Sequence, residues 1–137
     1  MHYETVLTYG TFDLFHRGHA SILQRARKLG DFLIVGCSTD EFNANKGKNS
    51  HQNFLIRKAA LERLPYVDHV FSEHDWGQKS HDIQKFKVDT FVMGDDWLGK
   101  FDWLKNDVAI RYLPRTKGIS STLLRTKLEI QHKYRSY

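Results

Sequence analysis

The sequence predicts an α/β domain built on a five-stranded parallel sheet with helices on both faces. Short apolar stretches typical of strands alternate with amphipathic stretches of about ten residues typical of helices, an order that indicates strand–helix–strand crossovers. Residues 32–35 (Phe-Leu-Ile-Val) are apolar at every position, as expected of a strand covered on both faces. The length of 137 residues fits one domain with a sizeable core.

The elements of this domain can be assigned in order along the chain. Strands are predicted at residues 4–9, 32–35, 67–71, 88–93 and 108–113. Helices are predicted at residues 18–29, 53–64, 80–87 and 120–130, with Gly30 and Pro65 ending the first two. We expect one domain over residues 1–130 and a polar, frayed tail at residues 131–137. Ligands of parallel sheets bind beyond the carboxyl ends of the strands, so functional residues are expected there.

Composition and charge exclude some classes of protein and leave others open. No apolar run is long enough to span a bilayer, and the N-terminus lacks the pattern of a signal peptide. Cys37 is the only cysteine, which excludes an internal disulfide and favours the cytoplasm. The net charge of +5 fits a phosphate site, a nucleic-acid surface or a basic solvated surface, and the basic residues form no single cluster.

The first candidate functional segment, His16-Arg17-Gly18-His19, lies after the first strand at a predicted helix start. A helix N-terminus offers free backbone N–H groups and the positive end of a dipole, and Gly18 allows a phosphate to approach the backbone. Imidazole N–H groups can donate to phosphate oxygens, and a protonated imidazole can stabilise a leaving phosphate chain. The alternative is two unrelated histidines among eight, one of them capping the helix. A metal pair is less favoured because no third ligand is near.

A second candidate segment, residues 115–122, opens the last predicted helix. Gly118 permits a tight turn, and Ser120 and Ser121 are natural N-cap residues with hydroxyl groups free to donate. The guanidinium of Arg115 can form two hydrogen bonds with one phosphate. An ordinary loop and helix cap is the alternative.

Two stretches that contain lysine are further candidates for binding phosphate groups. Lys46 and Lys48 lie in the polar residues 43–50, which by themselves indicate a solvated loop. Trp76 and Lys79 flank a short loop, where an aromatic wall beside an ammonium suggests a bound phosphate. Arg57, on the second predicted helix, either points to the same phosphate or is a surface arginine.

Acidic residues follow two of the strands. Asp95 and Asp96 come after the fourth strand, where they suit Mg²⁺, ribose hydroxyls or simply a turn. Asp13, just before the histidines, is another candidate magnesium ligand. The sequence therefore suggests a divalent cation, Mg²⁺, with Asp13 and Asp96 as its ligands.

Taken together these segments resemble the cytidylyltransferase family, small nucleotidyltransferases with a Rossmann-like sheet and an HxGH signature. Further matching segments follow the strands in order at residues 38–43, 93–97 and 115–120. The HxGH element is shared by many adenylyl- and cytidylyltransferases. Residues 94–97 (Gly-Asp-Asp-Trp), 99–102 (Gly-Lys-Phe-Asp) and 115–120 are similar to the branch of the family that acts on glycerol phosphate.

This resemblance implies in-line transfer of a cytidylyl group from CTP to sn-glycerol 3-phosphate, giving CDP-glycerol for teichoic acid or capsule synthesis, and pyrophosphate. It also implies a homodimer. The implied catalytic residues are His16, His19, Lys48 and Arg115. The implied CTP-binding residues are Thr11, Phe12, His16, Gly18, His19, Lys48, Gly94, Asp96, Arg115, Thr116, Gly118, Ile119, Ser120, Ser121 and Thr122. The implied acceptor-binding residues are Asp40, Lys46, Arg57, Trp76 and Lys79.

Two alternatives and one departure from the family pattern qualify this interpretation. Phosphocholine or phosphoethanolamine could be the acceptor, since tryptophans can form a cage for a quaternary ammonium, and ATP could replace CTP. A non-catalytic basic module that binds nucleic acid would instead need clustered lysines and arginines on one face. Pro65 occupies a position where relatives usually carry arginine, so the acceptor or the dimer contact could differ, unless Arg63 compensates.

Overall fold

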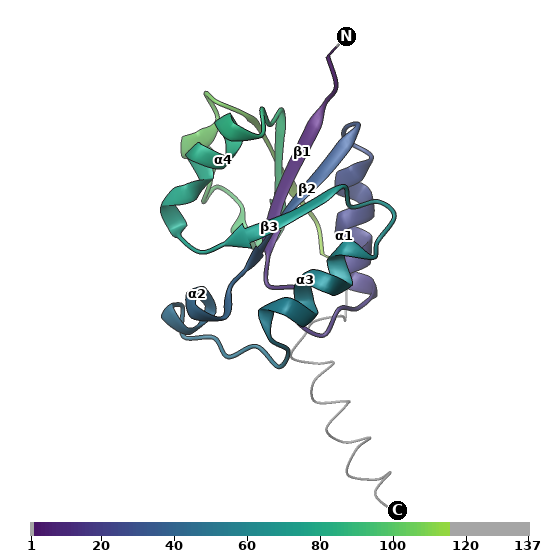
Figure 1. Cartoon of the computed structure of the whole chain (residues 1–137). Coiled ribbons are helices and arrows are strands. Elements are labelled where there is room, and N and C mark those ends of the chain that lie inside the picture. Colours follow the sequence, from purple (N-terminus) through teal and green to yellow (C-terminus); the bar gives the residue numbers. More distant parts are fainter. Residues whose placement is uncertain (1, 116–137) are drawn as a thin grey trace, which may run out of the picture.

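The computed structural model describes residues 2–115, which form a five-stranded sheet with every neighbouring pair parallel (Figure 1). The strands are β1 (Thr5–Gly10), β2 (Phe32–Ser38), β3 (His69–Glu73), β4 (Thr90–Gly94) and β5 (Ala109–Leu113), in the order β3-β2-β1-β4-β5. The predicted α/β fold class, Rossmann-like with one parallel sheet, is confirmed. The helix predicted at residues 120–130 and the tail lie outside the described residues.

The helices match the predicted order, with one addition. They are α1 (Arg17–Arg27), α2 (Asp40–Asn45), α3 (Phe54–Glu62) and α4 (Lys79–Lys85), with single 3₁₀ turns at Trp76–Gln78, Asp95–Trp97 and Asp102–Leu104. The sequence predicts no helix where α2 lies, because six residues are too few to show a helical period. Thr39 begins α2 as its N-cap, with its hydroxyl oxygen accepting from the backbone N–H of Phe42 at 3.1 Å.

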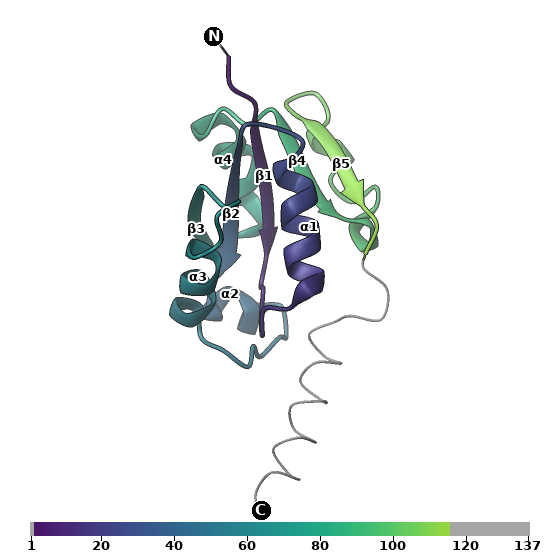
Figure 2. The same cartoon turned by 90° about the vertical axis from the view of Figure 1, so that its right-hand side faces the viewer.

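Two apolar clusters cover the two faces of the sheet. Val6 and Leu7 are neighbours on β1 and therefore point to opposite faces. Val6 packs in the cluster that includes Leu23 of α1 and Leu61 of α3, whereas Leu7 packs with Ile83 of α4. Figure 1 shows the same division, with α1 and α3 on one side of the strands and α4 on the other. Figure 2 shows α2 beyond the carboxyl ends of the strands, where ligands are expected.

The turn between β1 and α1 has an unusual backbone. Phe12 and Leu14 have φ angles of 54° and 49°, in the left-handed region that non-glycine residues rarely adopt. Each such residue costs about 1–2 kcal/mol, and both side chains are buried, so core packing holds the turn in place. This turn fixes the direction in which the chain enters the histidine motif.

Within residues 2–115, no helix combines the length and apolar character needed to cross a bilayer.

Candidate active site

A cavity of about 600 Å³ lies at the carboxyl ends of the strands and collects most of the predicted site residues. Two predicted residues, Asp40 and Arg57, do not line it. Thr116, Gly118, Ile119, Ser120, Ser121 and Thr122 lie outside the described residues, so their predicted roles stay predictions. The predicted residues that do line the cavity are Thr11, Phe12, Asp13, His16, Gly18, His19, Lys46, Lys48, Trp76, Lys79, Gly94, Asp96 and Arg115.

The two motif histidines cap α1 and stack on each other. Nδ1 of His16 accepts from the backbone N–H of Gly18 at 3.1 Å, and Nδ1 of His19 accepts from the backbone N–H of His16 at 3.3 Å. The ring centroids are 3.8 Å apart. Because each Nδ1 is an acceptor, the proton of each neutral ring lies on Nε2. Nε2 of His16 is buried and has no hydrogen-bond partner within the described residues, so the cavity wall contains a donor that lacks an acceptor.

This capping changes two expectations about the motif. The N–H groups of His16 and Gly18 are used by imidazole nitrogens and are not the free helix-terminal donors that the sequence predicts. Burial lowers the pKa of His19 to about 3, assisted by His16 and Arg115 and opposed by Asp13. Burial and then Arg115 also lower the pKa of His16. Both rings are therefore neutral at neutral pH in the free protein and act as N–H donors, not as imidazolium cations.

The buried neutral state of His19 predicts a pH-dependent stability. The unfolded chain binds a proton on His19 near pH 6.5, whereas the folded chain binds it only near pH 3. The free energy of unfolding should therefore fall as the pH drops through this window, because the unfolded state holds more protons. His19→Gln removes this contribution and should make the pH slope shallower by up to about 1.4 kcal/mol per pH unit. Urea denaturation at several pH values measures the slope.

Glutamine suits this test because it is a usual third residue of a capping box and keeps the helix start intact. His81→Gln, which changes an exposed histidine on α4, is the matched control. Identical pH slopes for wild type and His19→Gln would contradict the assignment of a buried neutral imidazole.

A segment that we call the lysine loop, residues 46–52, covers one side of the cavity. Its half-buried Lys46 and exposed Lys48 both line the cavity. The loop is anchored at its start by α2, because the side chain of Asn43 accepts from the hydroxyl of Thr11 at 3.2 Å. The carbonyl of Asn43 also accepts the backbone N–H of Lys48 at 2.8 Å. The lysine loop is thus tied to the β1 turn at its first residues, and is not the freely solvated loop that its composition suggests.

Asp13 anchors the other end of the lysine loop. Its carboxylate oxygens accept the backbone N–H groups of His51 at 2.7 Å and Gln52 at 2.9 Å. The side chain is buried, although it lines the cavity. These contacts give Asp13, predicted as a magnesium ligand, a positioning role for the loop.

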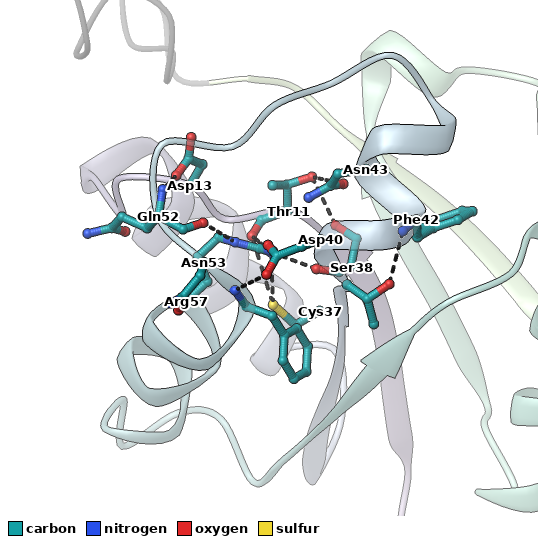
Figure 3. Close-up of polar contacts among 12 residues, drawn as sticks. Thr11, Asp13, Cys37, Ser38, Asp40, Phe42, Asn43, Gln52, Asn53 and Arg57 are labelled. Atoms are coloured by element: carbon teal, nitrogen blue, oxygen red, sulfur yellow. Dashed lines mark hydrogen bonds and ion pairs between the residues drawn. The ribbon is translucent and has the colours of Figure 1, made fainter.

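Arg57 joins four segments behind the cavity (Figure 3). Its fully buried guanidinium donates to the carbonyls of Thr11 at 3.0 Å, Ser38 at 2.7 Å and Gln52 at 2.9 Å, and to the carboxylate of Asp40 at 2.8 Å. These partners belong to the β1 turn, the end of β2, the lysine loop and the start of α2. The sequence predicts that Arg57 and Asp40 contact the acceptor. The structure instead places both in the support of the cavity wall, because the guanidinium is already bound by protein oxygens.

A buried ion pair surrounded by aromatic rings lines the cavity where β3 ends and α4 begins. Nζ of Lys79 lies 3.0 Å from Oε2 of Glu73, and both side chains are buried. The same ammonium lies 4.6 Å from the ring centroid of Tyr9, 5.1 Å from that of Trp76 and 5.5 Å from that of Phe101. Cation–π attraction therefore adds to the ion pair in holding Lys79 in place.

The chain is similar to known nucleotidyltransferases over most of its length. The model of the cytidylyltransferase-like family matches residues 7–127. The chain belongs to this family. It is 58% identical over 120 residues to the glycerol-3-phosphate cytidylyltransferase of Bacillus spizizenii, covering 88% of this chain and 93% of that protein. It is 54% identical over 123 residues to the enzyme of the same name from Staphylococcus aureus, covering 90% and 93%.

A solved structure supports the same conclusion for the fold of this cytidylyltransferase-like chain. The lipopolysaccharide core biosynthesis protein of Thermoplasma volcanium superposes with a TM-score of 0.69 at 26% identity, covering 86% of this chain and all of that one. The family resemblance found in the sequence is therefore confirmed.

An exposed ion pair lies at the edge of the cavity near β4. Nη1 of Arg115 lies 3.9 Å from Oδ2 of Asp96, and both side chains are more than half exposed. A Cβ atom at Gly94 would lie 2.7 Å from Oδ1 of Asp96, so a larger residue there would make the Asp96 carboxylate turn away. Of the two predicted magnesium ligands, Asp96 is the one with an accessible carboxylate. Mg²⁺ is usually bound by one or two carboxylates together with substrate phosphates, so this donor set fits the ion.

Several cavity residues in this cytidylyltransferase-like chain escape sequence reasoning. Glu73 is the last residue of β3 and lies buried in the cavity wall. Its position at a strand end was a usable signal, because ligands gather at the carboxyl ends of parallel strands. Phe101 lies in the matching segment 99–102, but no role in the cavity was assigned to it. Arg25 gave no signal, because it reaches the cavity only through the packing of α1.

Proposed function

We propose that this chain transfers the cytidylyl group of CTP to sn-glycerol 3-phosphate and releases pyrophosphate. The observation that carries the proposal is one cavity lined both by the imidazole rings of His16 and His19 and by three lysines, Lys46, Lys48 and Lys79. The names of the two bacterial relatives support this substrate pair. We propose the cytoplasm as its compartment, in line with the single buried thiol of Cys37, and polymers such as teichoic acid or capsule as the destination of CDP-glycerol.

The proposed reaction needs no covalent enzyme intermediate. A phosphate oxygen of glycerol 3-phosphate attacks the α-phosphorus of CTP, forming one P–O bond. The bond between the α-phosphorus and the oxygen bridging to the β-phosphorus breaks, and its electron pair leaves with pyrophosphate. His16 and His19 donate N–H groups to the triphosphate, while Lys48 and Arg115 neutralise its charge. Lys46 and Lys79 hold the acceptor phosphate in line.

We also propose Mg²⁺ as the cofactor, with Asp96 as its protein ligand. When bound, the ion neutralises charge on the phosphate oxygens. The exposed carboxylate of Asp96, which lies 3.9 Å from Nη1 of Arg115, would be the protein group that holds it.

The charges at the acceptor end disfavour phosphocholine and phosphoethanolamine. Two of the aromatic rings available to a substrate cation, those of Phe42 and Trp76, already contact the protein's own ammonium groups. Nζ of Lys46 lies 4.3 Å from the ring centroid of Phe42 and 5.5 Å from that of Trp76, and Lys79 contacts Trp76 from its own side. A choline or ethanolamine ammonium would therefore lie beside two like charges, whereas the uncharged glycerol group would not.

Pyrophosphate release tests the proposed function directly. Wild-type protein with Mg²⁺ should release pyrophosphate from CTP and glycerol 3-phosphate. Much less should be released when phosphocholine or phosphoethanolamine replaces glycerol 3-phosphate, or when ATP replaces CTP. Chelation of divalent cations with EDTA should abolish release, and added Mg²⁺ should restore it. Absence of pyrophosphate with every pair of substrates would refute the enzyme assignment.

We propose that two copies of the chain form a homodimer through the exposed face of α3. Leu55 is 73% exposed and Ile56 52% exposed, and both line a shallow groove that is separate from the cavity. Arg63 lines this groove and not the cavity, so it does not replace the family arginine at the acceptor end. Pro65 is exposed just beyond α3, and its departure from the family pattern bears on this face.

Leu55→Asp should therefore convert the dimer to a monomer, because a carboxylate would have to be buried against the second copy. Sedimentation velocity measures the change, and Lys58→Asp, which places the same charge outside the groove on the same helix, is the control. A wild-type protein that sediments as a monomer at micromolar concentration would rule out the proposed dimer.

A further inference from the structure

The carboxylate of Glu73 is an unexpected group in a cavity for anionic substrates. It is 4% exposed, lies at the end of β3 and lines the cavity. Oε2 is paired with Lys79 at 3.0 Å. Among residues 2–115, no side chain or backbone group donates to Oε1. One oxygen of this cavity-lining residue's carboxylate therefore has free acceptor capacity.

This negative charge opposes the binding of a phosphate. It reduces the attraction that Lys79 exerts on the acceptor phosphate, and it is costly to bury. A group with only acceptors, such as a phosphate oxygen, gains nothing from a carboxylate. A hydroxyl group does gain, because an O–H donor forms a strong hydrogen bond with an ionised acceptor. The chemistry of Glu73 therefore matches the alcohol part of the acceptor and not its phosphate.

We propose that Glu73 determines acceptor specificity by accepting a hydrogen bond from a free hydroxyl of the alkyl phosphate. This inference rests on the proposed function and defines the substrate class as phosphate esters that carry at least one further hydroxyl. Lys79 holds the carboxylate in position through Oε2 and leaves Oε1 for the substrate. The rings of Tyr9, Trp76 and Phe101 contact the Lys79 ammonium and help to hold it beside the carboxylate.

A substrate ammonium is a less suitable partner for the same oxygen. It would lie next to Lys79, whose Nζ is already 3.0 Å from the carboxylate, and in the cavity that Lys46 also lines. Like charges at such separations repel strongly away from bulk water. A neutral hydroxyl avoids this repulsion and still donates a hydrogen bond to Oε1 of Glu73.

The test compares glycerol 3-phosphate with propyl phosphate, which has the same carbon chain and no hydroxyl. The quantity measured is the ratio of kcat/KM for the two acceptors at saturating CTP, from initial rates of pyrophosphate release. Wild-type protein should prefer glycerol 3-phosphate by roughly 10³-fold or more, because bound propyl phosphate would leave the buried Oε1 of Glu73 without a hydrogen-bond donor. Glu73→Gln should reduce this ratio by about 10–100-fold, since it removes the charge from the hydrogen bond. Asp75→Asn, an exposed and isosteric change two residues away, should leave the ratio at the wild-type value.

The ratio separates the proposed role from a structural one. If Glu73 only positions Lys79, Glu73→Gln will weaken both acceptors equally and the ratio will not change, which would overturn the inference while leaving the proposed function intact. CTP affinity measured by calorimetry should be the same in Glu73→Gln and wild type. A wild-type protein that releases no pyrophosphate with either acceptor would overturn the proposed function and this inference with it.

Discussion

Replacing His16 with asparagine should lower turnover by about 10²–10³-fold or more, because the variant loses an N–H donor to the triphosphate as charge builds on it. Asparagine is chosen because its side-chain oxygen can replace Nδ1 as the cap of Gly18, while nothing replaces the donor at Nε2. Initial rates at saturating CTP and acceptor measure the loss, and urea denaturation checks that the fold is kept. His16→Ala should lose at least as much turnover and, in addition, about 1 kcal/mol of stability from the missing cap.

Arg17→Ala is the matched control for both His16 variants. Arg17 lies between the motif residues in the sequence, but it is exposed and does not line the cavity. Its removal should leave turnover close to that of wild type. A His16→Asn variant with nearly unchanged turnover would show that Nε2 of His16 does not contact the reacting phosphates.

Replacing Arg57 with methionine should destabilise the protein by about 3–5 kcal/mol, because it leaves buried acceptors without their donor. Three backbone carbonyls, from Thr11, Ser38 and Gln52, lose a charged partner at once. Asp40 loses its ion pair, although the backbone N–H of Phe54 still helps to hold the pKa of its carboxyl below the usual range. Such a loss is a large part of the roughly 5–15 kcal/mol of a typical domain.

Thermal and urea denaturation measure the effect, with Arg57→Lys as a milder variant that keeps the charge but not the planar fork of donors. The stability order should be wild type, then Arg57→Lys, then Arg57→Met. Lys58→Met changes the next residue of α3, whose surface ion pair with Glu62 at 3.8 Å should contribute less than about 1 kcal/mol. If Arg57→Met were no less stable than Lys58→Met, the network behind the cavity would not have the structural role assigned to it.

The rule that ligands gather at strand ends explains why much of the site was predictable. His16, Lys46, Lys79 and Asp96 all follow strands in the sequence, and the parallel sheet brings them to one cavity. The sheet itself was predictable because apolar runs and amphipathic stretches alternate clearly. The strand order was not predicted, since it depends on which edges pair in space.

The direction of individual side chains was not predictable in the same way. Arg57 carries the same charge as Lys79, yet it packs behind the cavity wall whereas Lys79 faces the substrate end. Only tertiary packing decides this, because both residues occur in ordinary helical sequence. For His16, the sequence offered helix capping and phosphate binding as alternatives. The structure shows that Nδ1 caps the helix while the opposite nitrogen, Nε2, stays unpaired, so one ring can serve both purposes.

The central place of β1 in the sheet has a consequence for synthesis of the chain. β1 is made first, and it pairs on one side with β2, which follows directly, and on the other with β4, which is made much later. A ribosome-bound chain can therefore assemble β1, β2 and β3 with α1 and α3 while the opposite edge of β1 is still unpaired. The histidines and the lysine loop belong to this early part, whereas Asp96 and Arg115 arrive with the late strands. The complete set of phosphate-binding residues therefore exists only after β4 and β5 have been made and the exposed edge of β1 has been closed.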